Sequence, residues 1–175
     1  MEPIEEDISQ TITRLRARGV VVDEPEESEQ PAAEAAHRAP DRYRHCLRSN
    51  WRGAWPIAPW TGLKSEPWAV TLLGDPGRGK THIATALHHE ASANRPRSWW
   101  LSWTDALACL RDEIRNPVAP GYYSTREKLR TDGVLLLDDV GASRSDTPFP
   151  LETLMETLLY RYDHMLPTIL TSNAN

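Results

Sequence analysis

The sequence predicts an α/β fold in which helices cover both faces of a parallel sheet. Apolar runs of strand length alternate with segments of helical periodicity between residues 68 and 171. The first run leads directly into a glycine-rich loop, and a later run ends in two aspartates. Strands that are apolar throughout are typical of a parallel sheet buried on both sides.

The alternation predicts four strands, three helices and an irregular preceding segment. The expected strands are 68–73, 98–103, 134–137 and 168–171, and the expected helices are 79–94, 104–115 and 151–164. Residues 40–67 are rich in Pro, Trp and Arg and have weak periodicity. We expect them to lie irregularly against the core and to pack through Trp51, Trp55 and Trp60.

The first 40 residues differ in composition from the rest. Residues 1–40 carry ten acidic side chains and four arginines, whereas residues 41–175 carry fifteen acidic and sixteen basic side chains. Apolar residues at helical spacing predict a short partner-binding helix within residues 1–20. Residues 21–38 are expected to be an acidic flexible linker, and residues 39–175 the core domain.

Composition excludes several classes of protein. No apolar run approaches the roughly 20 residues that cross a bilayer, and the acidic N-terminus does not have the pattern of a signal peptide. Cys46 and Cys109 have no disulfide or zinc-site spacing, and the adjacent His45-Cys46 pair is interpreted as incidental. We therefore expect a cytoplasmic protein without a membrane partner.

The glycine-rich loop matches the phosphate-binding pattern G-x-x-x-x-G-K-[ST] in full. The run is Gly74-Asp75-Pro76-Gly77-Arg78-Gly79-Lys80-Thr81, and His82 follows it. It lies after a strand and before a helix, as the motif requires. Backbone N–H groups of the loop would surround the phosphates of ATP, Lys80 would contact the β- and γ-phosphates, and Thr81 would bind Mg²⁺. We assign nucleotide binding to residues 74–82.

Polar residues follow two later strands and complete the expected site. Asp138 and Asp139 come after an apolar run, and Asn173 follows the last strand. Because parallel strands end at one edge of the sheet, these side chains should meet the phosphate loop. Asp138 is predicted to hold Mg²⁺ together with Thr81. The three predicted catalytic residues are Asp139 as general base, Asn173 in contact with the γ-phosphate, and Lys80.

Together these motifs resemble the AAA+ group that contains DnaC-type helicase loaders and IstB-type transposition helpers. The resemblance covers about residues 39–175 and is most specific in the two motifs just described. Lesser matches are a Pro-x-Arg-Tyr segment at 40–43, a polar turn and helix at 102–107, and the final strand. It implies that Lys80 and Thr81 bind nucleotide, that Asp138 and Asp139 form the Walker B pair, and that Asn173 senses the γ-phosphate.

The resemblance implies an ATPase acting in DNA replication as a loader of a replicative helicase, which the N-terminal region would bind. One alternative is an IstB-like transposition helper whose partner is a transposase. Another is a nucleotide-gated adaptor that binds ATP without hydrolysing it. Relatives continue with a fifth strand and an arginine finger, so we expect efficient hydrolysis and homo-oligomer formation only in a form longer than the 175 residues.

Two basic groups are candidate contacts for single-stranded DNA. They are Arg42/Arg44/Arg48/Arg52 and Arg111/Arg115/Arg126/Lys128/Arg130. The second group lies near Tyr122 and Tyr123, and cations with aromatic rings suit phosphate neutralisation and base stacking. An ordinary solvated surface remains the alternative interpretation.

Overall fold

The computed structural model describes residues 39–52, 54–93, 95–141 and 147–173. All of them belong to one compact unit spanning Ala32–Asn175. The helix expected within residues 1–20 and the linker expected at 21–38 lie outside the described residues. Among the helices in these ranges, none is long and apolar enough to cross a membrane.

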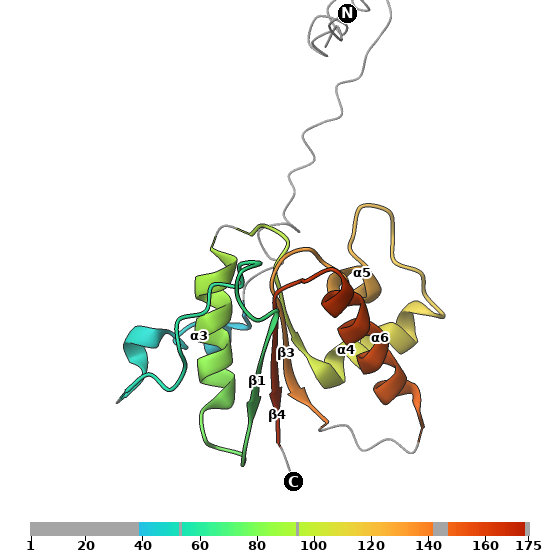
Figure 1. Cartoon of the computed structure of the whole chain (residues 1–175). Coiled ribbons are helices and arrows are strands. Elements are labelled where there is room, and N and C mark those ends of the chain that lie inside the picture. Colours follow the sequence, from blue (N-terminus) through green and yellow to red (C-terminus); the bar gives the residue numbers. More distant parts are fainter. Residues whose placement is uncertain (1–38, 53, 94, 142–146, 174–175) are drawn as a thin grey trace, which may run out of the picture. The chain divides into compact units, whose positions relative to one another are not determined.

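Four parallel strands form the centre of the fold, in the spatial order β1-β4-β3-β2 (Figure 1). They are β1 (Ala69–Leu73), β2 (Trp99–Ser102), β3 (Leu135–Val140) and β4 (Thr168–Ser172). Each strand lies within two or three residues of its predicted position. The parallel sheet predicted from the apolar runs is confirmed.

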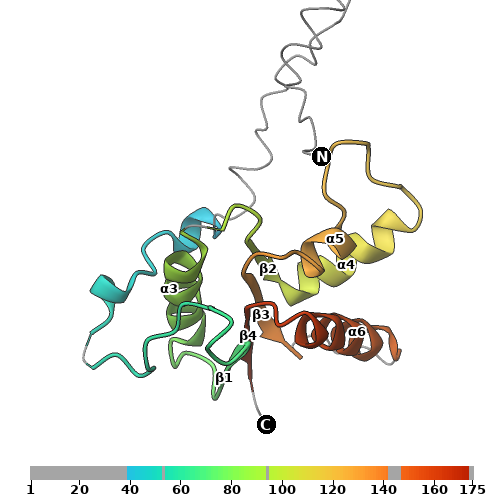
Figure 2. The same cartoon turned by 45° about the horizontal axis from the view of Figure 1, so that its top comes forward.

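Helices cover both faces of this sheet, as predicted (Figure 2). The principal helices are α3 (Lys80–Ser92), α4 (Trp103–Glu113) and α6 (Phe149–Asp163). Alternate residues of β3 divide between two cores, because successive strand side chains point to opposite faces. Leu136 packs with the α3 side, whereas Leu135 and Leu137 pack with the α4 and α6 side.

The segment before β1 is irregular, as expected. Among residues 39–68 the structure has two short 3₁₀ turns, η1 (Asp41–Tyr43) and η2 (Arg48–Asn50). Trp60 is buried in the core on the α3 side, and Trp51 and Trp55 pack against that core. The predicted packing role of the three tryptophans is confirmed.

Two details differ from the sequence predictions. The third strand does not end before the aspartates, because β3 continues through Asp138 and Asp139 to Val140. A further short helix, α5 (Thr125–Leu129), begins at a capping box in which Ser124 and Glu127 satisfy each other's backbone N–H groups. The Ser-x-x-Glu spacing was a readable signal for this helix, but its single turn has too little periodicity to reveal it.

Arg161 of α6 fastens the helix to the amino-terminal edge of the sheet. Its side chain is fully buried. It donates to the Thr168 hydroxyl and to four backbone carbonyls, those of Leu129, Thr131, Gly133 and Pro167. Burial lowers the pKa of the guanidinium to about 9, which leaves it protonated at neutral pH.

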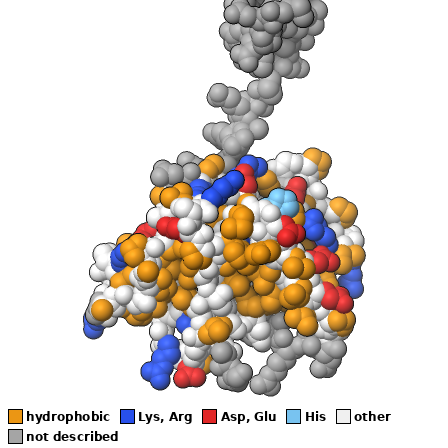
Figure 3. Space-filling view, viewed as in Figure 1, with side chains coloured by type: hydrophobic (Ala, Val, Ile, Leu, Met, Phe, Trp, Pro, Cys, Tyr) orange, Lys and Arg blue, Asp and Glu red, His pale blue; other side chains and the backbone are white. Residues whose placement is uncertain are grey.

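The outer face of α6 carries an apolar stripe. Its members are spaced at helical intervals and are about half exposed or more: Leu151, Met155, Leu159 and Tyr162. Figure 3 shows apolar side chains gathered over this part of the molecule. The helix therefore carries apolar side chains on its outer face as well as on the face that packs on the core.

Replacement of Arg161 by Met should destabilise the fold. The substitution keeps an unbranched apolar stem but removes every donor, so four buried carbonyls lose a charged partner. We expect the free energy of unfolding to fall by about 3 kcal/mol, measured as a lower urea midpoint at unchanged m-value. Arg126→Met is the control, because its guanidinium is exposed and lies 3.9 Å from Glu156. Equal losses in the two variants would contradict the anchoring role.

Candidate functional site

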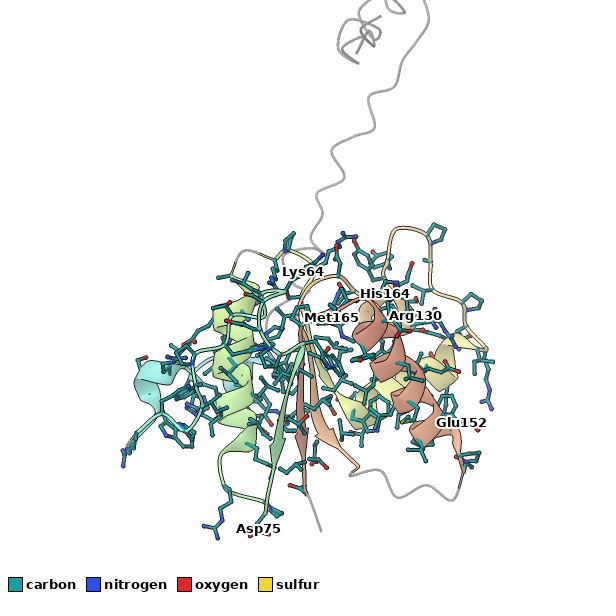
Figure 4. All side chains as sticks on the ribbon, in the orientation of Figure 1. Lys64, Asp75, Arg130, Glu152, His164 and Met165 are labelled. Carbon is teal, nitrogen blue, oxygen red and sulfur yellow. The ribbon has the colours of Figure 1, made fainter. Side chains whose placement is uncertain are left out.

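The glycine-rich loop connects the end of β1 to the first turn of α3, as the motif predicted. Gly74, Gly77 and Gly79 all have positive φ, at 146°, 78° and 82°, which glycine adopts without a steric penalty. Asp75 lies beyond the carboxyl end of β1, at the opposite edge of the sheet from Lys64 (Figure 4). Backbone N–H groups at such a helix start favour an anion.

Lys80 connects the loop to the last strand. Its ammonium donates to the Gly74 carbonyl at 2.7 Å and to the Asp75 carbonyl at 2.9 Å. It also donates to Oδ1 of Asn173 at 2.7 Å. The structure therefore brings Lys80 and Asn173 together, as the shared strand edge predicted, although 93 positions separate them.

Asp138 is the buried carboxylate of the site, with 6% of its surface exposed. The Thr81 hydroxyl donates to its Oδ1 at 3.0 Å, and the Thr171 hydroxyl donates to the same oxygen at 2.7 Å. The two hydroxyls come from α3 and β4, so a carboxylate on β3 joins three elements. Thr81 and Asp138, the two predicted Mg²⁺ ligands, are neighbours in the structure.

Asp139 occupies an irregularity in β3. Its φ is 60°, in the left-handed region that a non-glycine residue rarely adopts. Leu137 pairs with Leu170 and Val140 with Ser172, so β3 uses one residue more than β4 over this stretch. The Asp139 N–H donates to the Thr171 hydroxyl at 2.7 Å. Such a bulge re-aims a side chain.

Asn173 lies between the lysine and the second aspartate. Its Nδ2 donates to Oδ1 of Asp139 at 2.8 Å, while its Oδ1 accepts from Lys80. Because an ammonium only donates and a carboxylate accepts, these partners fix the orientation of the amide. The predicted catalytic residues Lys80, Asp139 and Asn173 therefore form one connected chain of side chains.

The segment before β1 packs directly against the phosphate loop. A Cβ added to Gly79 would lie 2.8 Å from the ring of Trp51, so only glycine fits beneath this indole. His82 is predicted to belong to the nucleotide contact, and its side chain faces this same segment. The His82 ring lies 5.4 Å from that of Trp51, and its Nε2 donates to the Leu47 carbonyl at 3.0 Å.

Cys46 is buried in this region. Burial raises the pKa of its thiol, and the negative charge of Asp138 raises it further.

Three of the four arginines of the first basic group have partners within the protein. Arg44 pairs with Asp41 at 2.7 Å, and Arg48 pairs with Glu90 at 2.8 Å. Arg42 lies over the ring of Tyr43 at 4.7 Å. Arg52 is exposed.

Two members of the second basic group line a hollow between α4, α5 and α6. The hollow has a volume of about 700 Å³, and Arg126, Arg130 and Tyr122 contribute to its lining. Tyr123 lines an adjacent smaller hollow with the same two arginines. Three cations of this group lie over aromatic rings: Arg111 over Phe149, Lys128 over Trp99 and Arg130 over Tyr160. The structure thus brings most of the predicted cations and both tyrosines together, away from the phosphate loop.

Thr171 is the site residue that the sequence analysis missed. Its hydroxyl contacts both aspartates, whereas the sequence predicts only its place in a buried strand. A hydroxyl in an otherwise apolar buried strand needs a hydrogen-bond partner, and this was the available signal. The partner was not readable, because it depends on β4 lying beside β3.

The phosphate loop, the paired aspartates and the sheet order define the class of protein. It is a P-loop protein whose fold is of the AAA+ type, and the fold predicted from the sequence is confirmed. The chain belongs to the IstB-like ATP-binding protein family, because the sequence model of that family matches residues 64–175.

Two curated relatives carry names that refer to insertion sequences and ATP binding. A protein of insertion sequence IS5376 from Geobacillus stearothermophilus is 33% identical over 109 residues, covering 61% of this chain and 40% of the relative. An IS21-like protein from Bacteroides fragilis (strain YCH46) is 32% identical over 93 residues, covering 53% of this chain and 42% of the relative. The chain thus spans about two fifths of the length of the curated relatives it matches.

Solved structures of replication proteins share the fold. The DnaC helicase loader matches with a TM-score of 0.60 and 21% identity, over 78% of this chain and 81% of that one. The replication initiator DnaA bound to AMPPCP and single-stranded DNA matches with a TM-score of 0.54 and 24% identity, over 64% of this chain and 34% of that one. At this identity the likeness concerns the fold.

Replacement of Thr171 by Val should remove the hydrogen bonds that hold the Asp138 carboxylate and the Asp139 backbone N–H in place. The shape of the side chain is kept, but the donor to Asp138 and the acceptor for the Asp139 N–H are lost. We expect a loss of about 1–3 kcal/mol in the free energy of unfolding and faster hydrogen exchange at the Asp139 amide. Thr71→Val, at an exposed position of β1, is the matched control. An unchanged hydrogen-exchange rate at the Asp139 amide would show that the Thr171 hydroxyl does not hold this part of the backbone.

Proposed function

We propose that this protein is an ATP-dependent helper of DNA transposition that binds Mg·ATP on its phosphate loop and signals the bound state to a transposase. The observation that carries the proposal is the chain of contacts from Lys80 through Asn173 to Asp139. It joins a phosphate-binding group to a candidate base by way of an amide. A γ-phosphate entering this chain would compete for the ammonium and the amide, so the contacts would change on binding.

The residues have distinct proposed roles. The N–H groups of residues 74–82 bind the phosphates, and Lys80 neutralises the β- and γ-phosphates. Thr81 and Asp138 hold Mg²⁺, since hydroxyl and carboxylate oxygens are the ligands this ion prefers. Asp139 orients and deprotonates the attacking water, and Asn173 contacts the γ-phosphate. The assignment of these two residues to Mg²⁺ rests on the Thr81–Asp138 contact, which places a hydroxyl oxygen and a carboxylate oxygen side by side.

The choice of transposase over helicase rests on the family and on the names of the curated relatives. Both relatives come from insertion sequences, whereas the likeness to the helicase loader concerns the fold. Helicase loading in DNA replication, the main function implied by the sequence resemblance, is therefore the second candidate. An adaptor that binds ATP without turnover has the same site, and ATPase measurements with and without DNA and transposase distinguish it.

Lys80→Ala should weaken ATP binding by roughly 10–100-fold or more, because it removes a charge-assisted contact to phosphate. Isothermal titration with a non-hydrolysable ATP analogue and Mg²⁺ measures this. Lys64→Ala is the control, since Lys64 lies at the opposite edge of the sheet (Figure 4). Unchanged affinity in Lys80→Ala would refute the site.

The full-length protein, with the transposase and the replicative helicase offered separately, tests the partner. ATP-dependent capture of the helicase instead of the transposase would overturn the helper role.

We propose further that the second basic group binds single-stranded DNA. Arg126→Glu with Arg130→Glu should weaken binding, because two phosphate contacts are lost and two negative charges added. The slope of log affinity against log salt should fall by about 1.4, or roughly 0.7 for each phosphate. Fluorescence anisotropy with a labelled oligonucleotide measures both quantities. Lys64→Glu controls for added negative charge, and a slope equal to that of wild type would exclude this surface.

A further inference from the structure

Three side chains with metal-binding atoms converge beside the phosphate loop. His45, Cys46 and His82 each offer one such atom, and these atoms all lie within 4.8 Å of one another. The Cys46 sulfur lies 3.8 Å from Nε2 of His45. His82 comes from a different element, the first turn of α3. The sequence alone favours an incidental His45-Cys46 pair, because its spacing does not reveal that His82 lies beside the pair.

The separations suit a shared ion. Zinc binds thiolate sulfur at about 2.3 Å and imidazole nitrogen at about 2.0–2.1 Å, so a tetrahedral centre places the two donors about 3.6 Å apart. The observed 3.8 Å between sulfur and nitrogen is close to this. One thiolate and two imidazoles are soft or intermediate donors, which select zinc-class transition metals over Mg²⁺.

The surroundings hold two of these residues in place. Nε2 of His82 contacts the Leu47 carbonyl at 3.0 Å. Because a carbonyl only accepts, this nitrogen carries the proton, and the lone pair of the neutral ring is on Nδ1. Such a carbonyl contact is the usual second partner of a metal-binding histidine. The His45 carbonyl accepts from the Asn50 side chain at 2.6 Å, which fixes the turn that presents His45 and Cys46.

We propose that His45, Cys46 and His82 form a binding site for a divalent zinc-class metal ion. Three protein ligands leave one position for water or a further ligand. The ion would connect the irregular segment before β1 to the first turn of α3, one residue after Thr81. It would thus fasten to the phosphate loop a segment that carries Trp51, whose ring lies against Gly79. The proposal does not depend on the transposition role.

Cobalt and zinc titrations of the nucleotide-free protein, freed of any histidine tag, test the site. Wild type should bind one equivalent and show a thiolate-to-cobalt charge-transfer band with the strong visible bands of tetrahedral Co²⁺. Cys46→Ala should lose the charge-transfer band. Cys46→Ala and His45→Ala should each weaken zinc binding by more than the roughly 10–100-fold that outer partners cost. Competition with a chromophoric chelator gives the affinities.

Cys109→Ala is the matched control, because it removes the other free cysteine, which is exposed. It should keep the band and the affinity. Thermal unfolding is a second measurement: zinc should raise the Tm of wild type and of Cys109→Ala but not that of His45→Ala, whose exposed side chain the fold does not need. Zinc affinity that is equal in wild type, Cys46→Ala and His45→Ala, or a cobalt complex without the charge-transfer band, would overturn the proposal.

Discussion

Two threonine hydroxyls, one on α3 and one on β4, donate to the buried carboxylate of Asp138 on β3, and the arrangement of the site depends on this contact. A buried carboxylate without donors would carry a large desolvation cost. The fold meets that cost with groups from both neighbouring elements, and so fixes their relative positions. The phosphate loop is thereby held against the carboxyl ends of the central strands, where ligands of parallel α/β sheets bind.

Arg161 performs the corresponding task at the other edge of the sheet. Its guanidinium bonds the carbonyls of Gly133 and Pro167, which precede β3 and β4. The two central strands are therefore fixed at both ends, by a cation at their start and by a carboxylate at their finish. Directly after the second anchor, the bulge at Asp139 is tolerated and turns that residue toward Asn173. Backbone strain of this kind persists where the surroundings over-determine it.

The segment before β1 is as much a part of the site as the motifs are. Trp51 covers Gly79, and the Leu47 carbonyl orients His82. The family match covers residues 64–175, so the segment that supplies these contacts precedes the matched range. The His45–Cys46–His82 cluster is a further contact between this segment and the first turn of α3.

Sequence patterns alone are enough to predict the parallel sheet, the phosphate loop and the edge where Asp138, Asp139 and Asn173 meet. Apolar periodicity and motif order are local properties, and parallel strands leave one place for their carboxyl ends. Three features depend on the tertiary structure: the role of Thr171, the left-handed backbone conformation of Asp139 and the convergence of His82 with Cys46. Each depends on which strand or turn lies alongside, and hydrogen bonds between distant segments leave no periodic trace in the sequence.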